Sequence, residues 1–198
     1  MSYCMERAKL YVDLDDTFLN TEMYLRMVLK ANDIKVEAGK TAYDYMDDVV
    51  VKELLEMIYK DYSVIPELPG AKESLDILKC DYDIVFTSSC FSEEERDAKE
   101  RYLSSKGVEY ALVMGTYDLS SYIKDGEKNL IVNDKSVVLE NSGICPINTY
   151  CLWNQRTSEK NIQEYLSSGG TVVFDWYELC DQIMGTQSIK LPKKLCKI

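Results

Sequence analysis

Short apolar runs alternate with amphipathic helical patterns along most of this 198-residue sequence. A short apolar run bounded by polar turns is typical of a strand that is buried on both faces of a sheet. Strands that alternate with helices form a parallel sheet covered on both sides. The sequence therefore predicts an α/β fold with a Rossmann-like parallel sheet. The expected strands are residues 9–13, 83–89, 110–114, 129–134, 147–152 and 171–174. The expected helices are residues 20–31, 71–79, 92–106, 158–167 and 176–183. A further, longer helix is expected to begin near residue 41.

The first expected strand carries two carboxylates at its carboxyl end. Asp13 is its last residue, and Asp15 follows where the chain leaves the sheet. Alternate residues of a strand share a face, so both side chains can point into one crevice, at the edge where open α/β sheets bind ligands. Two such acids repel each other unless a cation or a shared proton relieves them. One acid can then act as a nucleophile while the other transfers protons.

Polar side chains also end two further strands. Thr87 and Ser88 end the second strand, and Asn133 and Asp134 end the fourth. Because parallel strands place their carboxyl ends at one edge of the sheet, we expect these four residues to lie near Asp13.

The formal net charge of −11 restricts the partners of the protein. A broad nucleic-acid surface needs an excess of positive potential, so we expect no nucleic-acid polymer. An anionic small molecule requires a metal ion or one or two lysines to offset the repulsion locally. No apolar run approaches the ~20 residues needed to cross a bilayer, and the first residues lack the apolar stretch of a secretory signal. We therefore expect no membrane partner and a cytoplasmic location.

The sequence has seven cysteines and no histidine. No cysteine pair has the CxxC spacing, so a zinc site is disfavoured and reduced, unreactive thiols are expected. Without histidine, a general acid or base near neutral pH must be Asp, Glu, Cys, Lys or Tyr.

Residues 13–17, Asp-Leu-Asp-Asp-Thr, resemble the DxDx(T/V) signature of the haloacid dehalogenase superfamily in its phosphatase form. The resemblance implies that Asp13 is a nucleophile that takes on a phosphoryl group, and that Asp15 is the acid/base that protonates the leaving oxygen and then activates water. It also implies that Thr87, with Ser88 beside it, holds a phosphoryl oxygen, and that Mg²⁺ is the cofactor. The implied metal ligands are Asp13, Asp15, Asn133 and Asp134.

Two parts of the resemblance are less regular. The superfamily uses a lysine to neutralise the phosphate, and Lys124 matches its usual spacing before Asn133, with Lys128 and Lys106 as rivals. Where Asp-Asp is common in the superfamily, this chain reads Asn133-Asp134. Either Asn133 binds the metal through its amide oxygen with reduced affinity, or Asp134 is the main ligand, or the site is impaired and the protein binds without turnover.

Residues 18–66 read as a helical insertion that resembles a small all-helical C1-type cap, and residues 1–17 and 67–198 as the core. In the long cap helix, Met46, Val50, Leu54, Met57 and Ile58 are expected to form the apolar stripe. The cap is also rich in aromatics that could stack on a nucleobase or fill the core. These are Phe18, Tyr24, Tyr43, Tyr45, Tyr59 and Tyr62.

Within the superfamily, the chain resembles the 5′(3′)-deoxyribonucleotidase branch. The resemblance rests on residues 86–89 (Phe-Thr-Ser-Ser), residues 130–134 (Leu-Ile-Val-Asn-Asp), Asn154 and the Trp-containing segment 174–179. It implies a 5′-nucleotidase that hydrolyses nucleoside (deoxy)monophosphates. The alternatives are a phosphatase of another small phosphometabolite, a phosphotransferase or mutase, and a catalytically weak binding or regulatory protein. The sequence leaves the oligomeric state open, and a homodimer is compatible with it.

Overall fold

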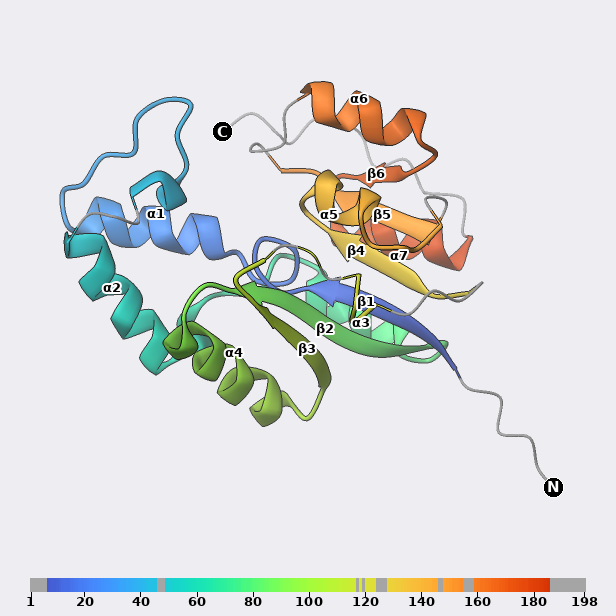
Figure 1. The fold of residues 1–198 in the computed structure, drawn as a ribbon, viewed down its shortest axis with the longest axis horizontal. Helices are drawn as coiled ribbons and strands as arrows, with labels where there is room; N and C mark the ends of the chain where they lie inside the picture. The colour runs from blue at the N-terminus through green and yellow to red at the C-terminus, as the bar shows by residue number, and fades with distance from the viewer. Residues whose placement is uncertain are drawn as a thin grey trace.

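The computed structural model describes residues 7–45, 49–116, 118, 120–123, 128–145, 148–154 and 159–185. Six strands within these ranges form one parallel sheet of order β3-β2-β1-β4-β5-β6 (Figure 1). The α/β class predicted from the sequence is therefore confirmed. The strands are β1 (Ala8–Asp13), β2 (Tyr82–Cys90), β3 (Glu109–Met114), β4 (Leu130–Asn133), β5 (Thr149–Leu152) and β6 (Thr171–Val173).

The helices that begin at Glu93 and Trp176 each follow a capping residue that the sequence makes recognisable. The Ser92 side chain accepts a hydrogen bond from the backbone N–H of Glu95, and Asp175 does the same for Glu178, which satisfies donors left free in a first helical turn. The helices are α1 (Thr21–Ala31), α2 (Val49–Lys60), α3 (Ala71–Leu78), α4 (Glu93–Lys106), α5 (Ser136–Glu140), α6 (Glu159–Ser167) and α7 (Trp176–Met184), with 3₁₀ turns η1 (Ala42–Tyr45) and η2 (Tyr62–Val64).

Alternate residues of the central strands fill two separate hydrophobic cores. Leu10 and Val12 of β1 belong to the core that also contains Trp176 of α7, whereas Tyr11 between them belongs to the core under α5 and α6. This two-residue period is the one expected of a strand that is buried on both faces. Both faces of the sheet are thus covered by helices, as the sequence predicts.

The long cap helix differs from the prediction at its start and in its buried face. It begins at Val49 rather than near residue 41, because Asp44 accepts hydrogen bonds from the backbone N–H and hydroxyl of Thr41 and closes the short turn η1. The buried side chains are Val51, Leu55 and Ile58. Met57 is 64% exposed, so its place in the apolar stripe was wrong. Met46 lies outside the described residues, and of Val50 only the backbone is described.

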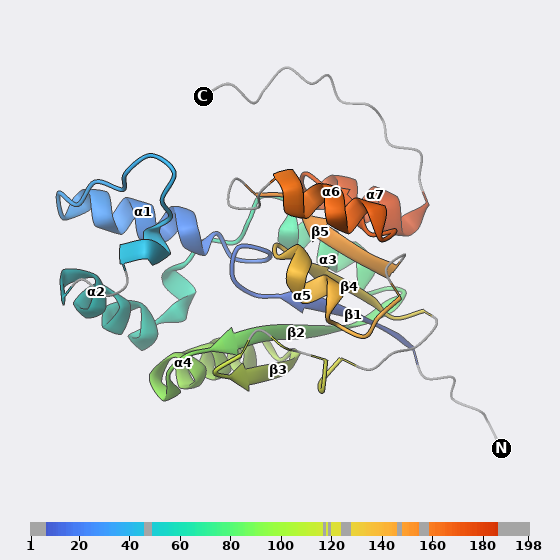
Figure 2. The same cartoon turned by 45° about the horizontal axis from the view of Figure 1, so that its top comes forward.

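The order of the strands fixes where a ligand can bind. The chain moves outward from β1 to β2 and β3, then returns to the other side of β1 with β4. A crevice forms outside the carboxyl ends of strands at such a switch point. Figure 2 shows α1 and α2 beyond the carboxyl ends of β1 and β2, on the side of this crevice. The division into a core and a cap at residues 18 and 66 stays a prediction.

The described cysteines are free thiols. Burial raises the pKa of the Cys90 thiol to about 11 and that of Cys151 to about 12, which keeps both protonated and poorly nucleophilic. Cys80 and Cys145 are exposed. None of the helices in the described ranges is long and apolar enough to span a membrane.

Helix α7 holds the loop that follows β1. The buried indole Nε1–H of Trp176 donates to the backbone carbonyl of Thr17 at 2.7 Å. We expect Trp176→Phe to lower the free energy of unfolding by about 1–3 kcal/mol, because the carbonyl loses its partner inside the core. Urea denaturation measures the change. Trp153→Phe, at a site 41% exposed, is the control and should change stability by about 0.5 kcal/mol or less. Equal effects in both variants would contradict this role of Trp176.

Candidate active site

The chain leaves β1 in a tight loop that presents Asp13 and Asp15. The backbone N–H groups of Phe18 and Leu19 both donate to the carbonyl of Leu14, and the N–H of Asp16 donates to the carbonyl of Leu19. Asp16 adopts a left-handed conformation with φ of 59°, which Asp tolerates better than most residues. The loop is therefore closed by its own backbone.

Asp16 connects this loop to α1 and η1. Its carboxylate accepts hydrogen bonds from the backbone N–H of Glu22, in the first turn of α1, and from the hydroxyl of Tyr43 in η1. An acid at this position also complements the positive end of the helix dipole. Asp16 thus has a structural task that differs from the tasks of Asp13 and Asp15.

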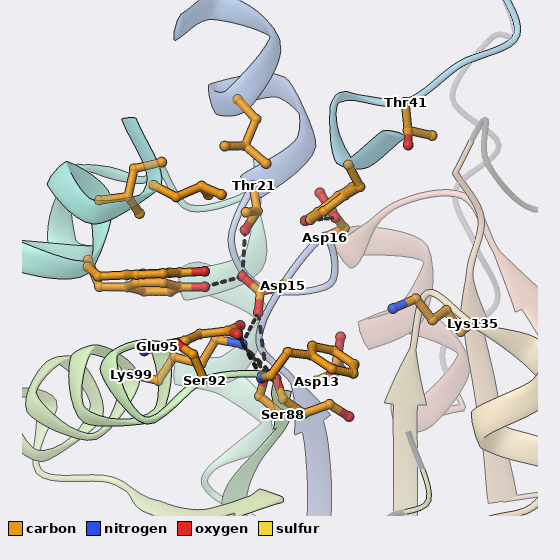
Figure 3. A pocket seen from close by; sticks show the side chains of 18 of the residues that line it. Asp13, Asp15, Asp16, Thr21, Thr41, Ser88, Ser92, Glu95, Lys99 and Lys135 are labelled. Carbon is orange, nitrogen blue, oxygen red and sulfur yellow. Dashed lines mark hydrogen bonds and ion pairs between the residues drawn. The ribbon is translucent and has the colours of Figure 1, made fainter. Parts of the chain in front are cut away.

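A cavity of about 600 Å³ lies over the carboxyl ends of β1, β2 and β4. Asp13 and Asp15 line it together with Ser88 from β2 (Figure 3). Asn133 from β4 also lines the cavity. Side chains predicted from three distant parts of the sequence thus meet in one cavity.

Asp15 is held by four hydrogen-bond donors. One carboxylate oxygen accepts from the Thr21 hydroxyl at 2.8 Å and from the Tyr62 hydroxyl, and the other accepts from Lys99 Nζ at 2.7 Å and from the Ser88 hydroxyl at 3.3 Å. Burial alone acts to raise the pKa of Asp15, but the charge of Lys99 and these hydrogen bonds hold it below its usual value. Asp15 is therefore an ionised carboxylate that joins the loop after β1 to α1, η2, β2 and α4.

Lys99 is the centre of this network, a role that was not predicted from the sequence. Its side chain is 1% exposed, and its ammonium group contacts the carboxylates of Asp15 and Glu95, each at 2.7 Å, the Ser88 hydroxyl at 2.9 Å and the Ser89 carbonyl at 2.8 Å. Burial acts to lower the pKa of Lys99, but the two carboxylates raise it above its usual value. A permanent positive charge thus lies beside Ser88 and Asp15.

The predicted phosphate-binding lysine, Lys124, lies outside the described residues. Of its rivals, Lys106 is exposed and pairs with Glu67 at 3.3 Å, away from the cavity. The described lysines that line the cavity are Lys52, Lys99 and Lys135. Lys135 follows Asp134 directly, which is the one signal in the sequence that could have suggested it.

The negative charge of Asp13 is offset by fewer neighbouring groups than the charge of Asp15. Burial raises the pKa of Asp13 well above its usual value, and the nearby charge of Asp134 raises it further, while Lys135 and Lys99 oppose them. The Thr17 hydroxyl lies 3.4 Å from the Asp13 carboxylate, a long hydrogen bond. A cation beside Asp13 and Asp134 would offset both effects.

Thr87 pairs with Asp13 in the register of the two neighbouring strands. Its hydroxyl is buried and makes no hydrogen bond to any described residue. A buried hydroxyl without a partner is costly unless a ligand supplies one. The position of Thr87 is therefore compatible with the phosphoryl contact predicted for it.

The residues around Asp134 fit a magnesium ion held mainly by two carboxylates. Asp134 is buried, and one of its oxygens accepts from the amide of Asn154 at 2.8 Å, which fixes its orientation. Asn133 lines the cavity, and its amide oxygen accepts from the backbone N–H of Lys135 at 2.8 Å. Mg²⁺ prefers such oxygen donors and keeps several waters. No cluster of three or more Cys, Asp or Glu side chains suited to a metal is found within the described ranges.

The raised pKa of Asp13 predicts a pH-dependent effect on stability. The folded chain favours the protonated form of Asp13, because its pKa is higher in the folded than in the unfolded state. The free energy of unfolding therefore falls as the pH rises from the pKa of the unfolded state, about 3.9, through the higher pKa of the folded state. Without divalent cations, we expect Asp13→Asn to melt at a higher temperature than the wild type at pH 7, with a gain that shrinks towards pH 4. Thermal unfolding across this range measures it, and a lower melting temperature of the variant at pH 7 would contradict it.

Three of the cap tyrosines lie at the cavity, and each is also part of the structure. Tyr62 is buried and bonded to Asp15, Tyr43 is bonded to Asp16, and Tyr59 lines the wall between them and α4. Tyr24 and Tyr45 pack against the core. The exposed Phe91, after β2, adds a further ring to the cavity wall.

Comparison with solved structures identifies the fold. A haloacid dehalogenase-like hydrolase, SP0104 from Streptococcus pneumoniae, superposes with a TM-score of 0.56 at 11% identity, over 89% of this chain and 98% of its own. A Thermotoga maritima protein assigned as a β-phosphoglucomutase gives 0.55 at 15% identity, over 92% and 100%. The Bacillus subtilis protein YfnB, assigned as a hydrolase of this type and solved bound to magnesium, gives 0.54 at 12% identity, over 90% and 99%. No protein-family model and no curated protein matches the sequence. The chain has the haloacid dehalogenase-like fold.

Proposed function

We propose that this protein is a Mg²⁺-dependent phosphomonoester hydrolase that forms a phosphoaspartate on Asp13. The observation that supports it best is the convergence of Asp13, Asp15, Ser88 and Asn133 on one cavity at the switch point of the sheet. The haloacid dehalogenase-like fold of the chain is compatible with this chemistry.

The proposed reaction has two steps. The Asp13 carboxylate attacks phosphorus and displaces the leaving alcohol, whose oxygen takes a proton from Asp15. Asp15 then removes a proton from the water that attacks the phosphoaspartate, which releases phosphate and restores Asp13. In the present arrangement Asp15 is ionised and bonded to Lys99, so the first step requires Asp15 to be protonated when substrate is bound.

The remaining polar groups would bind the phosphoryl group and the metal. Lys99 and Lys135 provide positive charge, and Ser88 and Thr87 provide hydroxyl donors for phosphoryl oxygens. We retain Asp13, Asn133 and Asp134 as the proposed metal ligands, since the Asp15 carboxylate is already engaged by four donors. Bound Mg²⁺ would stabilise the negative charge that develops on the phosphoryl oxygens.

Nucleoside monophosphates are the proposed substrates. Beside its charged end, the cavity has tyrosine and phenylalanine rings and aliphatic side chains. These side chains suit a leaving alcohol that carries an aromatic base, such as a nucleoside. A sugar phosphate is the second candidate, because a neighbour in structure is assigned as a β-phosphoglucomutase. The free thiols are compatible with the cytoplasmic location that the sequence predicts.

A weakly active binding protein is the alternative of a different class. Two observations favour it: Asn133 stands where a carboxylate is common, and Asp15 is tied to Lys99. Such a protein would bind phosphorylated ligands but release little phosphate.

Phosphate release from an aryl phosphate, 5′-nucleotides and hexose phosphates, with Mg²⁺ and with EDTA, tests the proposal. We expect release that depends on Mg²⁺ and is faster with nucleotides than with hexose phosphates. Release at the buffer rate with all substrates would favour the binding protein, and release that favours hexose phosphates would exclude the nucleotide assignment.

A further inference from the structure

Helix α2 of the cap turns one face towards the cavity. Lys52, Leu55, Glu56 and Tyr59 line it, and their spacing of three, one and three residues places them on a single side of the helix. This face combines an aliphatic side chain and an aromatic ring with two opposite charges. The apolar side chains of this wall can pack against the flat face of a ring-shaped ligand, and its charged side chains can bind polar groups at the edge of that ring.

Lys52 and Glu56 differ from the other charged groups of the cavity. Asp15 and Glu95 each form an ion pair with Lys99, whereas the charged groups of Lys52 and Glu56 make no ion pair or hydrogen bond within the described part of the chain. They also do not pair with each other, although residues four apart on a helix can do so. The cavity wall formed by α2 therefore carries a cation and an anion that a ligand can engage.

These two groups lie away from the phosphate end of the cavity. The carboxyl end of α2 lies beside α4, where Arg101 donates to the Tyr59 carbonyl at 2.7 Å (Figure 1). The hydroxyl of Tyr59 lies close enough to Glu95, Lys99 and Asp15 for their charges to affect its pKa, which burial raises. At 1.5 Å per residue, Lys52 is about 10 Å further along the helix than Tyr59. A leaving group that reaches from Asp13 past Tyr59 would present its far edge to Glu56 and Lys52.

We propose that Lys52 and Glu56 select the base of the substrate and favour guanine, an inference that rests on the proposed nucleotidase function. The guanine edge places the O6 acceptor beside the N1–H and 2-amino donors. The Lys52 ammonium can donate to O6, while the two Glu56 oxygens accept from N1–H and the 2-amino group. Hypoxanthine lacks the 2-amino donor, and adenine presents neither O6 nor N1–H.

The test compares 5′-GMP, 5′-IMP and 5′-AMP as substrates of the full-length protein. We expect kcat/KM of the wild type to be about tenfold higher for GMP than for IMP, because one hydrogen bond to a charged group is lost. Glu56→Gln should remove most of this difference. Lys52→Met should lower kcat/KM for GMP and IMP by a similar factor, since both bases carry O6, and so should preserve their ratio.

Glu53→Gln is the matched control, because Glu53 is exposed on the same helix but does not line the cavity. It should keep the wild-type ratio, and thermal unfolding of all variants verifies that they are folded. Nucleotide hydrolysis with equal kcat/KM for GMP and IMP, or a ratio unchanged in Glu56→Gln, would overturn the inference and leave the nucleotidase function in place. Hydrolysis of hexose phosphates without hydrolysis of any nucleotide would overturn both.

Discussion

Replacing Asp13 by Asn is expected to lower phosphate release by about a thousandfold or more. The amide cannot act as the nucleophile, and removal of a nucleophile costs most of the rate that an enzyme provides. Asn has nearly the same shape, and the burial that raises the pKa of Asp13 disfavours the charge that the substitution removes. We therefore expect a folded, inactive protein, measured by steady-state release from an aryl phosphate and from GMP with Mg²⁺.

Asp33→Asn provides the control for this substitution. Asp33 is exposed in the turn after α1 and has a φ of 60°, a conformation that Asn also tolerates. Its activity should equal that of the wild type. Similar rates for the wild type and Asp13→Asn would reject the hydrolase proposal, even if both rates exceeded that of the buffer.

The second large effect is expected at Lys99. Lys99→Met keeps the length of the side chain but leaves Asp15 and Glu95 without the cation between them. Loss of one partner from a buried charge network costs about 3–5 kcal/mol, so we expect a decrease of this size in the free energy of unfolding. Phosphate release should also fall, since Ser88 and Asp15 lose the group that orients them.

Lys72→Met is the matched control on α3. Lys72 pairs with Asp76 at 2.8 Å, but both side chains are exposed, and a pair of this kind contributes about 1 kcal/mol or less. Chemical denaturation at neutral pH compares the two variants. If Lys99→Met were as stable as Lys72→Met, the network around Lys99 would not be a stabilising unit.

The sequence was sufficient to predict the sheet and its reactive edge. Apolar runs alternating with helical patterns require a parallel sheet, and a parallel sheet places all carboxyl ends together. For this reason Asp13, Ser88 and Asn133, separated by 75 and 45 residues in the numbering, could be expected in one place before any coordinates were known. Their chemical roles remain predictions.

Lys99 and the face of α2 could not be predicted in the same way. Lys99 stands in a helix with many charged residues, where a lysine normally faces solvent. Its burial accompanies contacts with Asp15, in the loop after β1, and with Ser88 and Ser89 of β2. The phase of α2 depends on where that helix begins; Ala42–Tyr45 form the turn η1, and α2 spans Val49–Lys60. Both features arise from tertiary contacts rather than from local pattern.

The most direct test of the central claim is covalent capture of the phosphoryl group. The protein is mixed with Mg²⁺ and phosphate-labelled GMP, quenched in acid and digested, and the labelled peptide is identified by mass spectrometry. The account predicts label on the peptide that contains Asp13, sensitive to hydroxylamine and absent from Asp13→Asn. Label on a different residue, or turnover of GMP with no labelled peptide at any time after mixing, would contradict it.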